Sequence, residues 1–461
     1  MNLHSHSPTS GFAESSESGR EVKNSVLRQT LEWITLEGFA ATVFIVLTGG
    51  AFLTGLALLL GAGDFEIGLL GAIPFLAQIS QLVAALKIDS TGRKKMFTAR
   101  SLFFARQVWW VLLPLTLLDG EWRLYVLMIV MVISSVAATM GAAGWMSWVA
   151  DLVPGRIRGR YFGFRSAIVA LSTVTATMIG GALIDHFRAA NHESLGFSIL
   201  IAVACIFGLG AFLLMKRIPE NPNVQIGPEL KLGELLDPLR DKRYWHLIKI
   251  FIIWNFALGI SAVFFAAHML TNLKMSFTQV SIYVSGTSIV AVLLNKPWGI
   301  VIDRFGSKPV ITFCAFGISV IPLIWWLPRA GYLWVLVIEA VYSGALWAGF
   351  SLAAFNIPIA YSPQKNRTVY LAMFSVITGF GLFVASILGG LLAETWSWVY
   401  WGFGPQTFVN YHILFGISAV LRILGAIFIM GFNEPPGKCV PVMMQYMGES
   451  ILKRVAINRA G

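Results

Sequence analysis

Residues 299–308 read Gly-Ile-Val-Ile-Asp-Arg-Phe-Gly-Ser-Lys, and residues 89–94 read Asp-Ser-Thr-Gly-Arg-Lys. Each stretch ends a long apolar segment and precedes another, so each is interpreted as a short turn between two helices. The two aspartates are 214 positions apart (303 − 89), which places one acidic-glycine-basic turn in each half of the chain. The sequence therefore indicates a duplication whose unit contains several apolar helices.

Apolar residues dominate on both sides of these turns. Hydrophobic residues make up 56% of the chain and charged residues only 12%, which is about half the charge of a usual soluble domain. Runs of about 20 apolar residues recur, and each can cross a hydrocarbon core about 30 Å thick. Such spans must be helical, because lipid offers no partner for an unpaired backbone group and the alternation of a β-barrel is missing. We expect an all-α integral membrane protein.

Twelve membrane spans are predicted from the apolar segments. Their approximate bounds are 34–60, 65–88, 97–118, 123–150, 162–184, 195–216, 246–270, 278–302, 308–328, 332–360, 367–393 and 411–432. The polar segment 217–245 separates six spans from six; it begins as a linker and ends in a predicted short amphipathic helix on the membrane surface. We expect a tail over 1–33, six-helix bundles over 34–216 and 246–432, and a second tail over 433–461.

The basic residues predict the orientation in the membrane. Most of the 34 Lys and Arg residues fall in loops and helix ends on one side of the predicted bundles, the side that carries both termini. The positive-inside rule makes this side cytoplasmic. The expected location is the plasma (cytoplasmic) membrane, with both termini and segment 217–245 inside the cell. The net charge of +11 then reflects orientation, so we expect contact with membrane lipid and no nucleic-acid partner.

The two halves share further motifs at one offset of 209 residues (367 − 158). The pairs are Pro154-x3-Arg158-x2-Tyr161 with Pro363-x3-Arg367-x2-Tyr370, and Gly180-Gly-Ala-Leu-Ile-Asp185 with Gly389-Gly-Leu-Leu-Ala-Glu394. Chance rarely keeps one offset across a loop and a whole helix. A fixed internal period of this size indicates two related bundles.

The turns resemble the loop motif G-x-x-x-D-x-x-G-[RK]-[RK] of the major facilitator superfamily, and with the other repeats the resemblance covers residues 34–432. The first copy has Ala85 where the motif begins with Gly, and the second has Ser307 before a single Lys308. The resemblance implies twelve helices in two pseudo-symmetric six-helix bundles. It also implies transport by alternating access.

In that family the loops latch the bundles together on the cytoplasmic side. The residues to which this role is carried over are Asp89, Gly92, Arg93, Lys94, Asp303, Arg304, Gly306 and Lys308, with Arg158 and Arg367 as partners. An aspartate at a helix end can face the N-terminal dipole of a neighbouring helix, and glycine permits the sharp turn. The alternative is that these are ordinary basic loops that fix the orientation of the protein. The positive-inside rule, however, requires no aspartate in such loops.

Glu339 is the first candidate for a substrate or proton site, because ionisable residues inside a membrane are usually functional. It is predicted about 10 Å into the tenth span, at 1.5 Å per residue. Tyr342 and Ser343 follow at i+3 and i+4, on the same helix face. The resemblance implies that spans 1, 4, 7 and 10 line a central cavity. The alternative is a structural carboxylate, for example in an ion pair with Arg422.

Other candidates on the same spans are weaker. Glu37 lies near the cytoplasmic end of the first span, where water could also solvate it. The remaining candidates combine amide and indole groups and are Trp254, Asn255, Trp347 and Asn356. Each could instead serve helix packing. Arg106 and Arg422 lie on spans that are peripheral in the family, which favours ion pairs or snorkelling over substrate contact.

The sequence lacks a Walker motif, a nucleophile–base pair and a Cys/His cluster, so no ATP drive, enzymatic activity, metal or cofactor is expected. We expect a monomeric secondary transporter of a small organic solute, with proton coupling as one option. The alternative is a membrane assembly or chaperone-like factor that keeps this fold without transporting.

Overall fold

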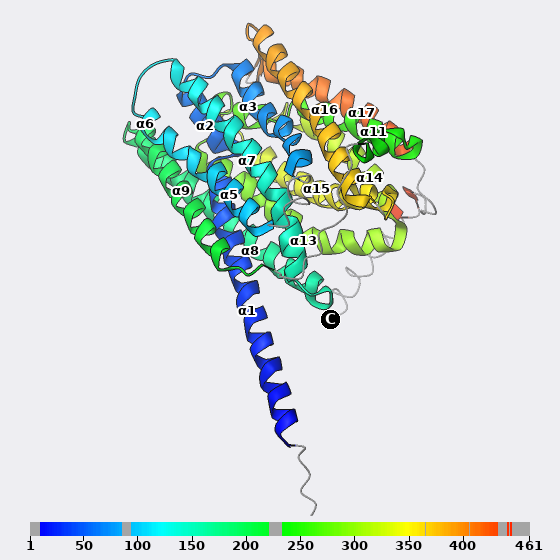
Figure 1. Ribbon diagram of the computed structural model, residues 1–461. Coiled ribbons are helices and arrows are strands. Elements are labelled where there is room, and N and C mark those ends of the chain that lie inside the picture. Colours follow the sequence, from blue (N-terminus) through cyan, green and yellow to red (C-terminus); the bar gives the residue numbers. More distant parts are fainter. Residues whose placement is uncertain are drawn as a thin grey trace, which may run out of the picture.

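Apolar helices make up nearly all of the protein. A computed structural model describes residues 10–84, 94–220, 233–364, 366–404, 406–431, 440–441 and 443–444. Within these residues, 11 helices are long and apolar enough to cross a membrane. The helices form two halves side by side, α1–α9 and α11–α17, and the first turns of α1 extend beyond the rest of the molecule (Figure 1). The prediction of an all-α membrane protein with two bundles is confirmed.

The N-terminal half begins with the longest helix. Its elements are α1 (Ser10–Leu47), α2 (Gly50–Leu59), α3 (Asp64–Ala77), α5 (Lys94–Gln107), η1 (Val108–Val111), α6 (Leu112–Leu115), α7 (Trp122–Leu152), α8 (Gly155–Ala189) and α9 (Glu193–Arg217). The predicted span 97–118 is not one helix but α5, a 3-10 turn and α6. Pro114 has no N–H to donate to the carbonyl of Trp110, which disfavours a continuous α-helix there.

The C-terminal half contains helices and one small hairpin. Its elements are η2 (Glu234–Leu236), α10 (Asp237–Arg240), α11 (Lys242–Gly259), α12 (Phe264–Thr271), α13 (Phe277–Phe305), α14 (Ser307–Ile324), α15 (Trp334–Tyr361), α16 (Arg367–Thr395), β1 (Tyr400–Phe403), β2 (Gln406–Val409) and α17 (Asn410–Gly431). The strands pair antiparallel, with Tyr400 opposite Val409.

The short amphipathic helix predicted before α11 is smaller than expected. Within the described residues 233–241, only the 3-10 turn η2 and the single turn α10 precede α11, because Asp241 ends α10 and starts the next helix. The Asp241 carboxylate accepts hydrogen bonds from the backbone N–H groups of Arg243 (3.0 Å) and Tyr244 (3.2 Å). This N-cap satisfies donors that have no partner inside the helix.

Two names are used below for the ends of the bundle. The basic face is the end that carries the helix ends at Lys94, Gly155, Arg217, Lys242 and Arg367. The opposite face carries the helix ends at Asp64, Ala189, Phe277, Thr395 and Asn410. The sequence predicts that the basic face is cytoplasmic.

Glycines allow the two halves to pack closely along two seams, α3 with α16 and α8 with α13. A Cβ atom on Gly181 would lie 2.4 Å from the Ser281 hydroxyl oxygen, and one on Gly68 would lie 2.8 Å from the Cα atom of Gly390. Both distances are too short for any side chain. The repeated Gly-Gly motif of the sequence therefore lies where helices of different halves touch.

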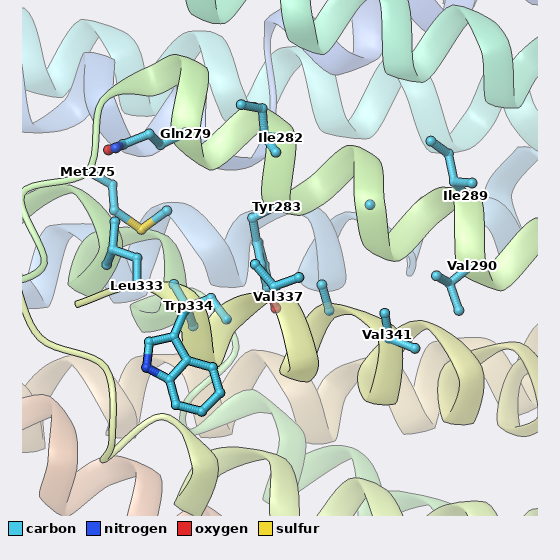
Figure 2. Close-up of a pocket in the computed structure, with 13 residues that line it drawn as sticks. Met275, Gln279, Ile282, Tyr283, Ile289, Val290, Leu333, Trp334, Val337 and Val341 are labelled. Carbon is cyan, nitrogen blue, oxygen red and sulfur yellow. The ribbon is translucent and has the colours of Figure 1, made fainter. Parts of the chain in front are cut away.

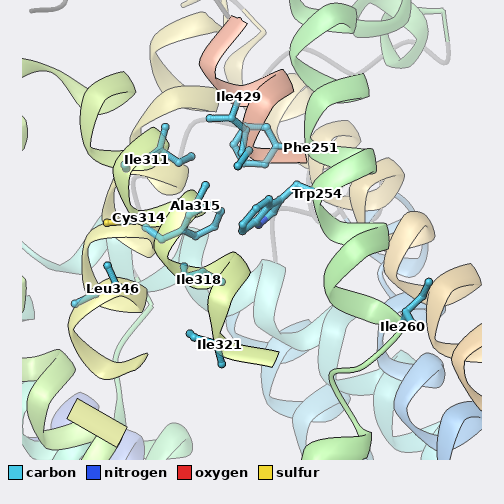
Figure 3. Close-up of a cluster of buried hydrophobic side chains, with 14 of the residues drawn as sticks. Phe251, Trp254, Ile260, Ile311, Cys314, Ala315, Ile318, Ile321, Leu346 and Ile429 are labelled. Atoms are coloured by element: carbon cyan, nitrogen blue, oxygen red, sulfur yellow. The ribbon is translucent and has the colours of Figure 1, made fainter. Parts of the chain in front are cut away.

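The interior of the C-terminal half is tightly packed between α11, α14, α15 and α17 (Figure 3). Trp254 is completely buried, and its ring stacks on Phe350 with centroids 5.0 Å apart. Cys314 lies in the same cluster as a buried free thiol. This core supports a cavity that lies beside it in the same half.

Candidate functional site

A cavity of about 320 Å³ lies inside the C-terminal half. Helices α11–α17 and the residues that join them supply its walls. Most of the lining is apolar or aromatic, and one carboxylate, one guanidinium and one serine hydroxyl interrupt it. The lining residues are Leu258, Ala262, Phe265, Tyr283, Ile321, Trp325, Glu339, Ser343, Trp347, Leu382 and Arg422.

Glu339 is fully buried on the inner side of α15. Its Oε2 atom accepts a hydrogen bond of 2.6 Å from the hydroxyl of Tyr283 on α13. Its Oε1 atom accepts no hydrogen bond from a described residue. Ser343 lines the same cavity one turn further along α15, as the helical spacing of the sequence predicts.

Arg422 reaches the same cavity from α17 and is also buried. Its Nη2 atom donates to the Ser261 hydroxyl (3.0 Å) and its Nη1 atom to the carbonyl of Ile318 (3.4 Å), whereas Nε has no partner among the described residues. Neither Arg422 nor Glu339 belongs to an ion pair within the described part of the chain. The ion pair expected for Arg422 is therefore not found, because the side chain turns inward and binds neutral groups.

Glu339 and Arg422 give the cavity a definite chemistry. A buried polar atom without a partner loses the hydrogen bond that water would have provided. Here a carboxylate oxygen and a guanidinium nitrogen, both unpartnered, belong to residues that line one small space. A solute that donates to the carboxylate and accepts from the guanidinium would satisfy both. Trp325 and Trp347 supply flat apolar walls for the rest of such a solute.

The structure brings to Glu339 only some of the candidates that were predicted on span 332–360, which is α15. Ser343 and Trp347 line the cavity. The hydroxyl of Tyr342 instead donates to the carbonyl of Gly317 on α14, at 3.0 Å. Asn356 is exposed near the other end of α15.

The candidates that were predicted on span 246–270 lie on α11 and outside the cavity lining. Trp254 belongs to the buried core and stacks on Phe350. Asn255 donates from its side chain to the carbonyl of Thr378 on α16, at 3.3 Å. Both positions fit the packing alternative better than direct contact with a solute in this cavity.

Glu37 is not solvated, contrary to one of the two expectations for it. Only 2% of the residue is exposed. Its Oε1 atom lies 3.3 Å from Nη2 of Arg106, and its Oε2 atom accepts a hydrogen bond of 3.2 Å from Nε1 of Trp145. The ion pair expected for Arg106 is confirmed. Both oxygens of this carboxylate are thus engaged within the N-terminal half.

The loop residues of the basic face are only partly described. Asp89, Gly92 and Arg93 lie outside the described residues. Lys94 forms an ion pair of 2.7 Å with Asp151 of its own half. Arg158 also binds within its half, through the carbonyls of Ala150 (3.0 Å) and Val153 (3.3 Å), which end α7.

In that second loop, Gly306 joins α13 to α14 with a φ of +92°, a backbone conformation that favours glycine. Asp303 and Arg367 are exposed. The guanidinium of Arg304 lies over the ring of Phe305, 5.6 Å from its centroid. Lys308 lies in the first turn of α14. The latch role of these residues stays a prediction.

Two carboxylates join the two halves at the opposite face. The Asp185 carboxylate of α8 accepts hydrogen bonds of 2.8 Å from the backbone N–H groups of Phe277 and Thr278, at the start of α13. The Asp64 carboxylate of α3 accepts from the side chain of Asn410 (2.7 Å) and from the Tyr411 hydroxyl, at the start of α17. Each contact joins the N-terminal half to the C-terminal half.

The sequence interpretation did not assign roles to Asp185, Asp64 or Tyr283. Asp185 ends the repeated Gly-Gly motif, so its place at a helix end was a usable signal. Tyr283 carried no such signal, because only the packing of α13 against α15 brings its hydroxyl to Glu339. Arg422 did carry one: it is a lone arginine within an apolar span, and such residues are usually functional.

A model of the Major Facilitator Superfamily matches residues 38–267 and 256–438. An uncharacterized MFS-type transporter of Methanocaldococcus jannaschii is 19% identical over 360 residues, covering 77% of this chain and 89% of its own. The minor myo-inositol transporter IolF of Bacillus subtilis is 23% identical over 376 residues, covering 74% and 80%.

Solved transporters share the fold at low identity. The crystal structure of a D-xylose-proton symporter has a TM-score of 0.69 at 15% identity and covers 89% of this chain and 98% of its own. The crystal structure of the nucleoside transporter NupG has a TM-score of 0.62 at 14% identity and covers 88% and 98%. These likenesses establish the arrangement of the helices and carry no information on the solute.

Proposed function

The chain belongs to the Major Facilitator Superfamily, and we propose that it is a secondary transporter of a small hydroxyl-bearing organic solute, working as a monomer by alternating access. The observation that carries this proposal is the cavity with Glu339 and Arg422, each of which keeps an atom without a partner among the described residues and so fits a ligand with both a donor and an acceptor. A hydroxyl group can do both.

The size of the cavity supports a small solute. Its volume of about 320 Å³ lies at the lower end of the range of roughly 300–1,000 Å³ that is usual for ligand sites. The relative from Bacillus subtilis is named for myo-inositol, which carries several hydroxyl groups. Its name supports the class of solute, and the geometry of this cavity supports the residues that would bind it.

Proton coupling would act through Glu339. The carboxyl is buried, has no charged partner, and keeps one oxygen for the solute or a proton. Burial disfavours the charged form of a carboxylate. A proton taken up on one side of the membrane and released on the other would tie solute movement to a proton gradient.

Alternating access requires that the two faces open in turn. The contacts of Asp185 and Asp64 represent a state with the opposite face closed. The loop residues Asp303 and Lys308 would close the basic face in the other state, together with Asp89 of the first loop. With the basic face in the cytoplasm, these contacts support an inward-facing assignment for this state.

Uptake into vesicles tests the proposal. In the purified full-length protein, Glu339→Gln should abolish accumulation of a labelled pentose, cyclitol or nucleoside under a proton gradient. Counterflow of the same solute should be retained in part, because exchange needs no net proton movement. Glu121→Gln, which removes an exposed carboxylate before α7, is the matched control and should accumulate like the wild type.

Two results would contradict it. Wild-type accumulation by Glu339→Gln would remove the coupling role of this carboxyl. Failure of the folded wild-type protein to exchange any of these solutes would favour the alternative of a membrane assembly factor without transport.

A further inference from the structure

A second hollow opens on the outer surface of the C-terminal half, between α13 and α15 (Figure 2). It is a groove of about 520 Å³. Its walls are nearly all apolar. Six residues that define them are Ile282, Gly286 and Val290 from α13 and Leu333, Val337 and Val341 from α15 and its N-cap.

The groove faces the bilayer. Val337 is 68% exposed and Ile282 is 57% exposed, although both lie in helices that can span a membrane. At this level the two halves are joined by the Asp185 contacts and by the Ser281 hydroxyl, which donates to the carbonyl of Thr177 at 2.8 Å. Apolar surface that is exposed here on the outside of α13 and α15 therefore contacts lipid.

The length of the groove matches one leaflet. Along α13 it runs from Gln279 to Val290, which is about 16 Å at 1.5 Å per residue. The hydrocarbon of one leaflet is about 15 Å deep, half of a core of about 30 Å. Gln279 and Trp334 lie at one end of the groove (Figure 2), near the starts of α13 and α15 at the opposite face. A Trp at this end fits the membrane–water interface, which indole rings favour.

Tyr283 is the wall between the groove and the solute cavity. The residue lines both spaces. Its hydroxyl donates to Glu339, and its ring packs edge-on against Trp325 with centroids 5.5 Å apart. Only this aromatic side chain and its neighbours in the wall separate membrane lipid from a buried carboxyl.

We propose that the groove binds one acyl chain of a membrane phospholipid, which packs against Tyr283 and keeps its hydroxyl on Glu339. An apolar hollow left unfilled would lose dispersion contacts on one side of every lining atom. An acyl chain has the required length and polarity, and the wall that it presses on carries a direct hydrogen bond into the solute site. The lipid is thus a ligand of the C-terminal half that seals the cavity from the side.

Photolabelling tests the proposal without any measurement of transport. The full-length protein is placed in phosphatidylcholine vesicles that contain a phosphatidylcholine with a diazirine on one acyl chain, and labelled peptides are mapped. Labelling should concentrate on the parts of α13 and α15 that line the groove. Gly286→Leu should reduce it several-fold, because a Cβ at Gly286 has room, 4.0 Å from the nearest atom, and its branch fills the groove.

Gly210→Leu is the matched control, since a Cβ at Gly210 of α9 meets nothing within 4 Å. It adds the same side chain to another span and should leave the labelling of the groove unchanged. Val337→Phe narrows the groove at an exposed position and is used if Gly286→Leu does not fold. Labelling spread evenly over all lipid-facing helices, or labelling of the groove that both filling variants leave intact, would overturn the proposal.

Discussion

Each half of the molecule buries a carboxylate and a guanidinium between its helices, but only one half joins them. In the N-terminal half, Glu37 is paired with Arg106, and its second oxygen accepts from Trp145. In the C-terminal half, Glu339 and Arg422 line one cavity without forming an ion pair, and each keeps an unpartnered atom. The same side-chain types thus pair within one half and line the proposed solute cavity in the other.

The two halves differ in the side chains that surround the buried carboxylate. Glu37 has its partners within direct reach on both sides, so its helices need nothing further. Glu339 has a neutral partner, Tyr283, on one oxygen, and Arg422 has only neutral acceptors. A charge that is buried without a charged partner is a weak source of stability. Its presence within a membrane span is better explained by a ligand.

The largest expected effect tests the paired half. Arg106→Met removes the partner of Glu37 and leaves a buried carboxylate uncompensated, which should lower the free energy of unfolding by about 3–5 kcal/mol. Thermal unfolding of the purified protein in detergent measures the change. The double variant with Glu37→Gln should recover part of the loss, because the orphaned charge is then removed as well. A single variant as stable as the wild type would show that the pair is not structural.

A smaller effect on binding, with little effect on stability, is expected in the other half. Arg422→Met replaces an unpaired guanidinium by an apolar side chain, and such replacements are often neutral or stabilising. Solute binding should weaken by about tenfold or more, the equivalent of one lost charged hydrogen bond of about 1.5–3 kcal/mol. Counterflow and thermal unfolding on the same preparation measure both. If Arg422→Met destabilised the protein as much as Arg106→Met, Arg422 would be a structural residue like Arg106, and the proposed difference between the halves would be wrong.

The sequence predicts the fold well, because composition and span length leave helices as the main choice in a membrane. It also predicts Ser343 beside Glu339, since both lie on one helix and helical spacing decides which residues share a face. Tyr283 and Arg422 come from other helices, and their approach to Glu339 depends on how α13 and α17 rotate and pack. Trp254 shows the converse. Its indole group suited a binding site, but packing against Phe350 places it in the core.

The smallest expected effect concerns the contacts that the N-terminal half makes with its neighbour at the opposite face. Asp185 places a carboxylate at the N-terminus of α13, where it accepts two backbone hydrogen bonds and faces the positive end of the helix dipole. Asp185→Asn keeps a side-chain acceptor and removes the charge. The lost attraction is about 0.3–2 kcal/mol, which changes the ratio of two conformations from less than twofold to about thirtyfold.

That loss should favour the state that is open at the opposite face. Spin labels at the helix ends near Ala189 and Thr395 would then show a larger share of long distances in Asp185→Asn than in the wild type. Asp303→Asn, at the basic face, is the opposing variant: if the predicted latch operates, it should shift the population the other way. Both variants remove one carboxylate near a helix end. A general loosening of the protein would therefore shift the distance distributions of both variants in the same direction. Shifts in opposite directions would show that carboxylates at the two faces compete for the same conformational equilibrium.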